Sequence, residues 1–79
     1  MKIKIWALSY ASIDSDDALY TATIGLYVNK DDAFKAMKYN VSYDIKDGDI
    51  EDNWKINSNT ADYVDDFSIT RKSYRINLL

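Results

Sequence analysis

The sequence ALYTATIGLYV at residues 18–28 runs directly into NKDDAFKAMKYNV at residues 29–41. The first segment is rich in β-branched and aromatic side chains, which suit the half-buried surface of a sheet and predict a strand. In the second segment apolar residues recur at helical spacing, as at Ala33 and Val41, so one face of a helix can be buried. Asn29 stands where the pattern changes, and asparagine is favoured at helix N-caps. We therefore predict a strand that leads into a capped helix.

Apolar and polar side chains alternate in the first segment, and successive residues of a strand point to opposite faces. We predict one face made of Ala22, Ile24, Leu26 and Val28, and an opposite face made of Thr21, Thr23, Gly25 and Tyr27. In the helix, Phe34 and Met37 share the apolar stripe. We expect both to lie in the core that joins the helix to the sheet.

The residues before this region predict a second strand. Residues 2–10 alternate between lysine and isoleucine before they become apolar on both faces. Residues 11–17 contain serines and aspartates, which are typical of turns. Together with the strand at residues 18–28, they indicate an N-terminal β-hairpin.

The residues after the helix predict further extended structure. We predict a short strand around residues 54–57, where Trp54 and Ile56 alternate with polar residues, and a turn, or one helical turn, at residues 61–65. Residues 67–78 return to strand character, with a bulge or bend near residues 71–73, where the apolar face changes. The elements predict one α+β domain over residues 1–79. Its antiparallel sheet has three to four strands, from the N-terminal hairpin and a C-terminal strand or hairpin, and the helix packs on one face.

The composition lacks the usual catalytic and metal-binding side chains. The chain has no cysteine and no histidine, so it lacks thiol nucleophiles, imidazole bases and the common zinc ligands. The acidic turn around Gly48 does not fit a calcium-binding loop, because Tyr43 and Ile45 would occupy ligand positions. Adjacent aspartates such as Asp65 and Asp66 point in different directions on a strand or a helix. We therefore expect no enzymatic activity, no metal and no cofactor.

The sequence favours a cytoplasmic protein. Lys4 interrupts the apolar residues near the N-terminus, and the remaining run is too short for a signal peptide. No apolar stretch approaches the ~20 residues that span a bilayer. The absence of cysteine is typical of a reducing compartment. We expect neither secretion nor a membrane partner.

Negative charge is concentrated in residues 44–66. This segment holds eight acidic residues and two lysines, a local net charge of −6 in a chain of net charge −3. Aromatic residues stand among the acids, and large aromatics are enriched at interface hot spots. We predict a partner-binding surface made of Asp44, Asp47, Asp49, Glu51, Asp52, Trp54, Asp62, Tyr63, Asp65 and Asp66. For Trp54, an interface anchor and a core residue are equally consistent with the sequence.

The basic residues suggest an alternative surface. If the terminal strands pair, a sheet face could combine Lys2, Lys4, Arg71, Lys72 and Arg75 with Trp6, Tyr10 and Tyr74. RNA-binding sheets stack bases on such aromatic residues. We favour the simpler interpretation that the lysines protect sheet edges, because the acidic pI of about 4.6 opposes phosphate binding. We expect no direct nucleic-acid binding.

Residues 24–34 (IGLYVNKDDAF) join a glycine-containing strand end to a capped helix. With the hairpin before it and the strand after it, this order resembles many small bacterial and phage proteins. Small size, acidity and the lack of catalytic residues are similar to phage-encoded anti-defence proteins, including anti-CRISPR inhibitors. The resemblance implies an inhibitor in the host cytoplasm that acts on a nucleic-acid-binding effector such as a Cas nuclease. The resemblance concerns the general type of protein and not aligned residues, so it identifies no site residue in this chain.

Two functions are consistent with these observations. The leading hypothesis is a small acidic inhibitor or adaptor that blocks a nucleic-acid-handling protein, with nucleic-acid mimicry as one mechanism. The alternative is a structural or regulatory module that self-associates through a sheet edge. A homodimer is compatible with this alternative.

Overall fold

Five strands and one long helix make up the fold. The computed structural model describes residues 2–79. Its elements are β1 (Trp6–Ile13), β2 (Leu19–Tyr27), α1 (Lys30–Lys46), the short 3-10 helix η1 (Glu51–Asn53), β3 (Trp54–Ile56), β4 (Thr60–Val64) and β5 (Thr70–Leu78). The strands form one antiparallel sheet in the order β2-β1-β5-β4-β3. The predicted α+β class is confirmed, but the sheet has five strands where the sequence predicts three to four.

β4 is the strand that the sequence prediction misses. At residues 61–65 the sequence predicts a turn or a helical turn, whereas the chain there pairs with both β3 and β5. Ala61 is fully buried opposite Tyr74. Asp62 points to the other face, where Ser73 Oγ donates a hydrogen bond to its carboxylate. The strand therefore alternates as strands do, but its acidic residues hide the pattern.

The expected bulge in the last strand is present. The sequence predicts a strand at residues 67–78 with a bulge or bend near residues 71–73. Tyr63 lies opposite Lys72 and Val64 lies opposite Thr70, so Arg71 is an extra residue of β5 against β4 and forms a β-bulge. β5 begins later than predicted, at Thr70, because residues 65–69 form the hairpin turn.

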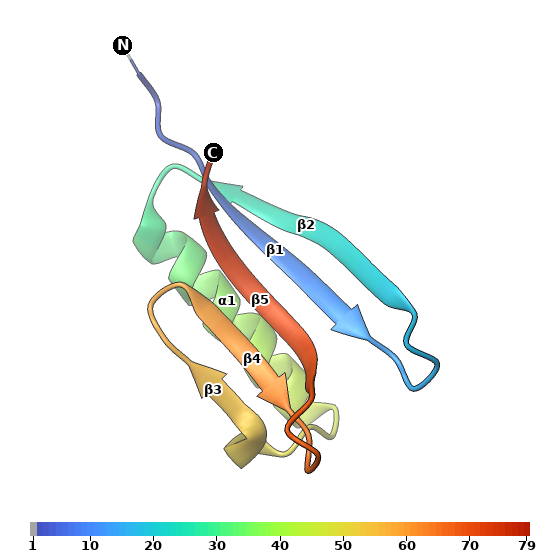
Figure 1. The fold of residues 1–79 in the computed structure, drawn as a ribbon. Coiled ribbons are helices and arrows are strands. Elements are labelled where there is room, and N and C mark those ends of the chain that lie inside the picture. The colour runs from blue at the N-terminus through green and yellow to red at the C-terminus, as the bar shows by residue number, and fades with distance from the viewer. Residues whose placement is uncertain (1) are drawn as a thin grey trace.

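α1 covers one face of the sheet and leaves the other face without a covering element, as Figure 1 shows. Its buried residues are Ala33, Met37 and Val41. The prediction that Met37 belongs to the core is confirmed, since its side chain is fully buried. Phe34 is only partly buried at the rim of the core, with the Lys38 ammonium over its ring. We call the two faces of the sheet the helix face and the uncovered face.

The core lies between α1 and the central strands. Leu8 lies opposite Ile76, and Tyr10 lies opposite Tyr74, so directly paired residues share the helix face. The buried cluster consists of Leu8, Ala33, Met37, Val41, Trp54, Ala61, Tyr74 and Ile76. Aromatic rings of all five strands continue this cluster across the helix face, from Tyr20 through Tyr10 and Tyr74 to Trp54 and Tyr63. Large buried rings help a chain of this length to form a stable core.

β2 does not keep one apolar face. Its register to β1 shifts by one residue, so Ile24 forms a β-bulge. On one side of the bulge Ala22 lies opposite Tyr10 on the helix face, whereas on the other side Leu26 lies opposite Ala7 on the uncovered face. The prediction of a continuous apolar face along this strand is therefore wrong, because the extra residue exchanges the two faces.

The β1–β2 and β4–β5 hairpins close with the same turn. Asp14 and Asp65 each accept hydrogen bonds on Oδ1 from the backbone N–H groups two and four residues later. Asp17 and Ser68, three residues after these aspartates, have positive φ angles of 60° and 61°. Arg71 connects the turns, since its Nε lies 2.8 Å from Asp65 Oδ2 and its Nη1 donates to the Asp14 carbonyl. This is the hairpin geometry of a type I turn followed by one left-handed residue.

Candidate functional site

The ten residues of the predicted partner-binding surface lie in three separate places. Around the C-terminal end of α1 and in η1 lie Asp44, Asp47, Asp49, Glu51 and Asp52. In and beside the core lie Trp54 and Tyr63. On β4 and in the turn after it lie Asp62, Asp65 and Asp66. The structure does not gather the ten residues on one surface.

Trp54 is a core residue. Only 7% of it is exposed, and its ring lies 5.9 Å from the Tyr74 ring and 5.3 Å from the Tyr63 ring, measured between centroids. Its Nε1 has no hydrogen-bond partner within residues 2–79. Tyr63 is half-buried, and its hydroxyl oxygen accepts a hydrogen bond from the Ile50 N–H group. Both aromatic residues therefore stabilise the fold from the inside.

Two carboxylates at the end of α1 are used to attach the helix to β5. The Tyr74 hydroxyl donates a 2.6 Å hydrogen bond to Asp44 Oδ2, and Lys72 Nζ lies 2.7 Å from Asp49 Oδ2. Burial and then the Asp44 hydrogen bond raise the pKa of the Tyr74 phenol well above its ordinary range. Burial alone would lower the pKa of Lys72, but the hydrogen bond and charge of Asp49 outweigh it and raise this pKa. The neutral phenol and the charged ammonium are both favoured by these contacts.

The carboxylates of β4 and its turn are also mostly engaged within the chain. Ser73 Oγ donates a 2.6 Å hydrogen bond to Asp62 on the uncovered face. The hydrogen bond from the Ile69 N–H group, followed by the bond from Arg71, lowers the pKa of Asp65 below its ordinary value. Asp66 is exposed in the turn. This group therefore stabilises the turn and the sheet.

α1 ends in a glycine turn, after which the chain leads to Asp49 and η1. Asn29 occupies the N-cap position at the other end, without a side-chain hydrogen bond. At the C-terminal end, Gly48 has a φ of 127°, and its N–H group donates to the Ile45 carbonyl while that of Asp49 donates to the Asp44 carbonyl. This pair of bonds is a Schellman motif, which needs a residue that tolerates positive φ.

Four of the ten predicted residues are exposed carboxylates outside these contacts: Asp66 in the turn after β4, and three others near the C-terminal end of α1. We call these three the acidic helix end: Asp47, Glu51 and Asp52. Neither ion pair found in residues 2–79 includes them. Asp47 is the C-cap residue, and a negative charge there is unfavourable because it lies at the negative end of the helix dipole. Tyr43 and Ile50 flank the group, and each is 56% exposed.

The basic and aromatic residues of the terminal strands share a face only in part, since Lys72 lies over the Tyr63 ring on the helix face. β1 and β5 pair as the alternative hypothesis requires, but Tyr10 and Tyr74 pack on the helix face. Arg75 lies opposite Ser9 on the uncovered face. Arg71 and Lys72 each form an ion pair with an aspartate. The arrangement of an RNA-binding sheet, with cations and stacked rings together, is therefore not formed.

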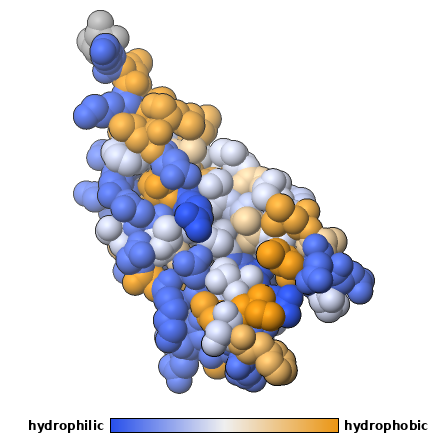
Figure 2. All heavy atoms as spheres, in the orientation of Figure 1, coloured by the Kyte–Doolittle hydropathy of each residue, from blue (hydrophilic) through white to orange (hydrophobic). Residues whose placement is uncertain are grey.

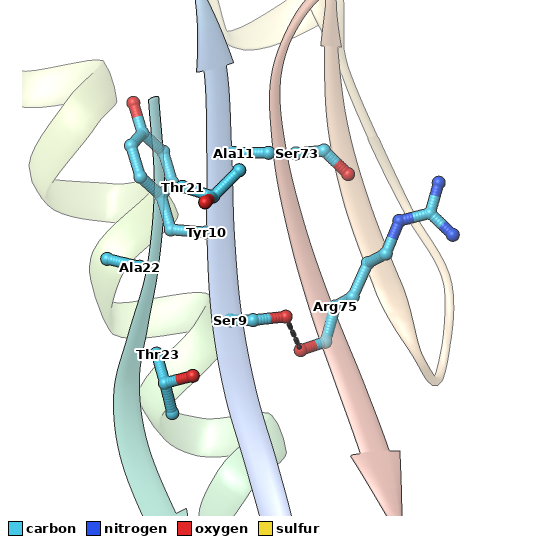
Figure 3. A pocket seen from close by; sticks show the side chains of 8 residues that line it. All are labelled: Ser9, Tyr10, Ala11, Thr21, Ala22, Thr23, Ser73 and Arg75. Atoms are coloured by element: carbon cyan, nitrogen blue, oxygen red, sulfur yellow. Dashed lines mark hydrogen bonds between the residues drawn. The ribbon is translucent and has the colours of Figure 1, made fainter. Parts of the chain in front are cut away.

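The uncovered face holds a shallow groove that the sequence analysis did not identify. Its volume is about 370 Å³, and Figure 3 shows its lining of Ser9, Tyr10, Ala11, Thr21, Ala22, Thr23, Ser73 and Arg75. Most of the side chains that line this hollow are small. Its hydroxyl groups have no histidine or cysteine beside them, so no familiar nucleophile–base set is present. The groove comes from three strands, so only the sheet register reveals it.

Apolar side chains border this face at the hairpin turns. In Figure 2, which has the orientation of Figure 1, pale side chains cover the middle of the face and orange ones gather near the two turns. Leu19 and Phe67 are 67% and 83% exposed there. Ile13 and Ile69 add further exposed apolar surface. Leu26 is 61% exposed toward the other end of β2, so the uncovered face is partly apolar at both ends.

Comparisons with known proteins assign neither a family nor a function to the chain. No protein-family model, curated protein or solved structure matches the chain. Within residues 2–79, no three metal-ligating side chains are grouped to hold an ion. In the same residues no helix has the length and apolar character needed to cross a membrane. The resemblance to anti-defence proteins stays a prediction.

Proposed function

We propose that the chain is a non-enzymatic inhibitor that places its acidic helix end against a basic surface of a nucleic-acid-handling protein. The observation that supports this proposal most is the contrast among neighbouring carboxylates. Asp44 and Asp49 have partners within the chain, whereas the three carboxylates of the acidic helix end are exposed and form none of the ion pairs in residues 2–79.

The position of these charges favours an external partner. Asp47 opposes the helix dipole, so it lowers the stability of the isolated chain slightly. A lysine or arginine from another protein would reverse this effect. Complementary charges also speed the encounter of two proteins. The charge of Asp47 therefore destabilises the free chain slightly, but it would stabilise a complex with a basic partner.

The surroundings of the acidic helix end suit a protein partner. Tyr43 and Ile50 add exposed apolar surface next to the charges, and tyrosine is enriched among residues that anchor interfaces. The Asp49–Lys72 ion pair and the glycine turn hold the segment against β5. A pre-ordered surface loses less conformational entropy on binding.

The number of charges limits the mechanism. A DNA duplex carries one negative charge per ~1.7 Å of its axis, so three carboxylates match a local basic patch and not a long groove. We therefore propose competition at one part of a nucleic-acid-binding surface. Overlap of the two binding sites would make the chain an inhibitor.

Charge reversal with a matched control tests the proposal. A tagged chain is used to capture its partner from host lysate, and the purified partner is then measured with Glu51→Lys/Asp52→Lys and with Asp16→Lys/Asp66→Lys. Both variants change the net charge equally at exposed positions. We expect at least about tenfold weaker binding for the first variant, mainly through slower association, and less than about twofold for the second.

Two outcomes would contradict the proposal. Equal loss in both variants would show that only net charge matters, and unchanged affinity in the first would exclude the acidic helix end. Circular dichroism first confirms that both variants are folded. Nucleic acid that binds the partner should compete with the chain, and a stable ternary complex would rule out inhibition by overlap.

A further inference from the structure

β2 is a long edge strand with one unpaired side. Within residues 2–79, β1 is its only neighbour in the sheet order β2-β1-β5-β4-β3. It extends over nine residues, Leu19–Tyr27. The peptide groups that point away from β1 are therefore free to pair with another strand. Exposed edges of this kind are templates for strand addition.

The usual features that prevent edge pairing are nearly absent from β2. Residues 18–29 contain no charged side chain and no proline. Leu19 and Tyr20 are 67% and 60% exposed. The one protective feature is the bulge at Ile24, because a bulge twists an edge and interrupts its pairing. It leaves the regular segment from Leu19 to Thr23 available.

We propose that this segment pairs antiparallel with the same segment of a second copy, about a two-fold axis at Thr21. Leu19 then lies opposite Thr23 of the second copy, and Tyr20 lies opposite Ala22 of the second copy. In each copy Thr21 and Thr23 line the groove on the uncovered face, and Tyr20 points to the helix face beside Tyr10. Every pair in this register therefore joins residues of the same face, which antiparallel pairing requires.

The groove lies next to the proposed pairing edge. It is lined on the β2 side by Thr21, Ala22 and Thr23, so the register places the exposed Leu19 of the second copy beside Thr23, on the same face as the groove. The two-fold axis repeats this contact. An edge without charge also brings no like charges together. These features favour a second copy of the chain as the partner that pairs with the β2 edge. The product is a closed two-fold dimer that joins two five-stranded sheets.

The dimer leaves the acidic helix end free. That group follows α1 on the side of β3 and β4, where the Ile50 N–H group bonds to Tyr63, and β2 lies at the opposite edge of the sheet. A dimer would thus present two acidic helix ends, which is a geometry for bivalent binding. The two proposals use different surfaces, so either can fail without the other.

Sedimentation of the full chain tests the dimer. We expect the wild type to have twice the monomer mass of 9.1 kDa, and Thr21→Lys to weaken association at least about tenfold because it opposes two lysines at the axis. Thr70→Lys is the matched control, since Thr70 is also exposed and begins β5. It should associate as the wild type does. A wild type that stays monomeric at about 1 mM would overturn the proposal.

A cysteine at the axis tests the register without depending on a destabilising change. The chain has no cysteine, and directly opposed residues in an antiparallel pair have Cβ atoms about 4.5–5.5 Å apart. This separation is slightly longer than a disulfide requires, so a short thiol-specific bifunctional reagent should link Thr21→Cys into a covalent dimer, whereas it should not link Thr70→Cys. A dimer that Thr21→Cys fails to cross-link, or that both cysteine variants cross-link equally, would overturn the proposed pairing.

Discussion

The two edge strands of the sheet differ in length, charge and cover. β2 has nine residues, none of them charged. β3 has three residues, with Lys55 between the buried Trp54 and the exposed Ile56. A short strand with a central lysine is a poor template for another chain, whereas a long uncharged strand is a good one. The fold therefore protects one edge and leaves the other available.

The largest difference between the edges should appear when an apolar side chain is removed from each. Trp54→Ala should lower the free energy of unfolding by about 3–5 kcal/mol, because a buried aromatic side chain is lost from the core. Leu19→Ala should lower it by less than about 0.5 kcal/mol, because this side chain is mostly exposed in the single chain. Urea unfolding followed by circular dichroism measures both.

Two details keep this measurement specific. Both substitutions are made in the Thr21→Lys background, so that association does not contribute to stability. Trp54→Phe retains an aromatic ring and removes the unpaired Nε1 group, and it should cost less than Trp54→Ala. Similar losses for Leu19→Ala and Trp54→Ala would show that the two edges do not differ in burial.

A smaller effect should distinguish two tyrosines of the same aromatic row. Tyr74→Phe removes the hydroxyl that bonds to Asp44 and should cost about 1–2 kcal/mol, the lower part of the range for bonds to charged groups because Asp44 is partly exposed. Tyr20→Phe on β2 is the control, since that ring is 60% exposed; it should change stability by less than about 0.5 kcal/mol. Equal changes in urea unfolding would contradict a structural role for the Asp44 bond.

The smallest effect should come from Asp65, in the turn that joins β4 to β5. The Ile69 N–H bond and then the Arg71 bond lower its pKa in the folded state below 3.8, its ordinary value. The unfolded chain therefore takes up the proton first as the pH falls. The contribution of Asp65 to stability is complete above pH 3.8 and is lost as the pH falls through the folded-state pKa.

Acid titration of the unfolding free energy measures this contribution. Asp65→Asn keeps a side-chain oxygen for the turn but cannot ionise, so its stability should fall less steeply below pH 3.8 than that of the wild type. Asp66→Asn is the control, because it removes the next carboxylate, which makes none of these bonds. Identical slopes for Asp65→Asn and the wild type would show that the Asp65 contacts do not persist in solution.

Local periodicity explains which elements were predictable. The N-terminal hairpin, α1 and the short strand at Trp54–Ile56 have patterns that repeat within a few residues, and all three are present. β4 was not predictable because Asp62 and Asp65 resemble loop residues until their partners Ser73 and Arg71 are placed. Gly25 lies next to the bulge at Ile24, and a glycine inside a strand often marks a bulge, but only the register shows that the faces of β2 are exchanged there.

The candidate surfaces were less predictable than the fold. The sequence placed ten residues in one binding surface, but charge density cannot show which carboxylates meet a donor. Asp44 bonds to Tyr74, 30 positions away, and Asp49 to Lys72, 23 positions away. The uncharged character of residues 18–29 is visible in the sequence, but only the strand order shows that this segment is an edge.

By itself, the sequence determined the period of each segment, the lack of histidine and cysteine, and the distribution of charge. These are local properties, because they depend on side-chain type and spacing alone. Only the tertiary structure decided that Trp54 is buried, that Asp47, Glu51 and Asp52 stay exposed, and that β2 ends the sheet. Burial and pairing depend on which distant strands become neighbours, and that choice minimises the free energy of the whole chain.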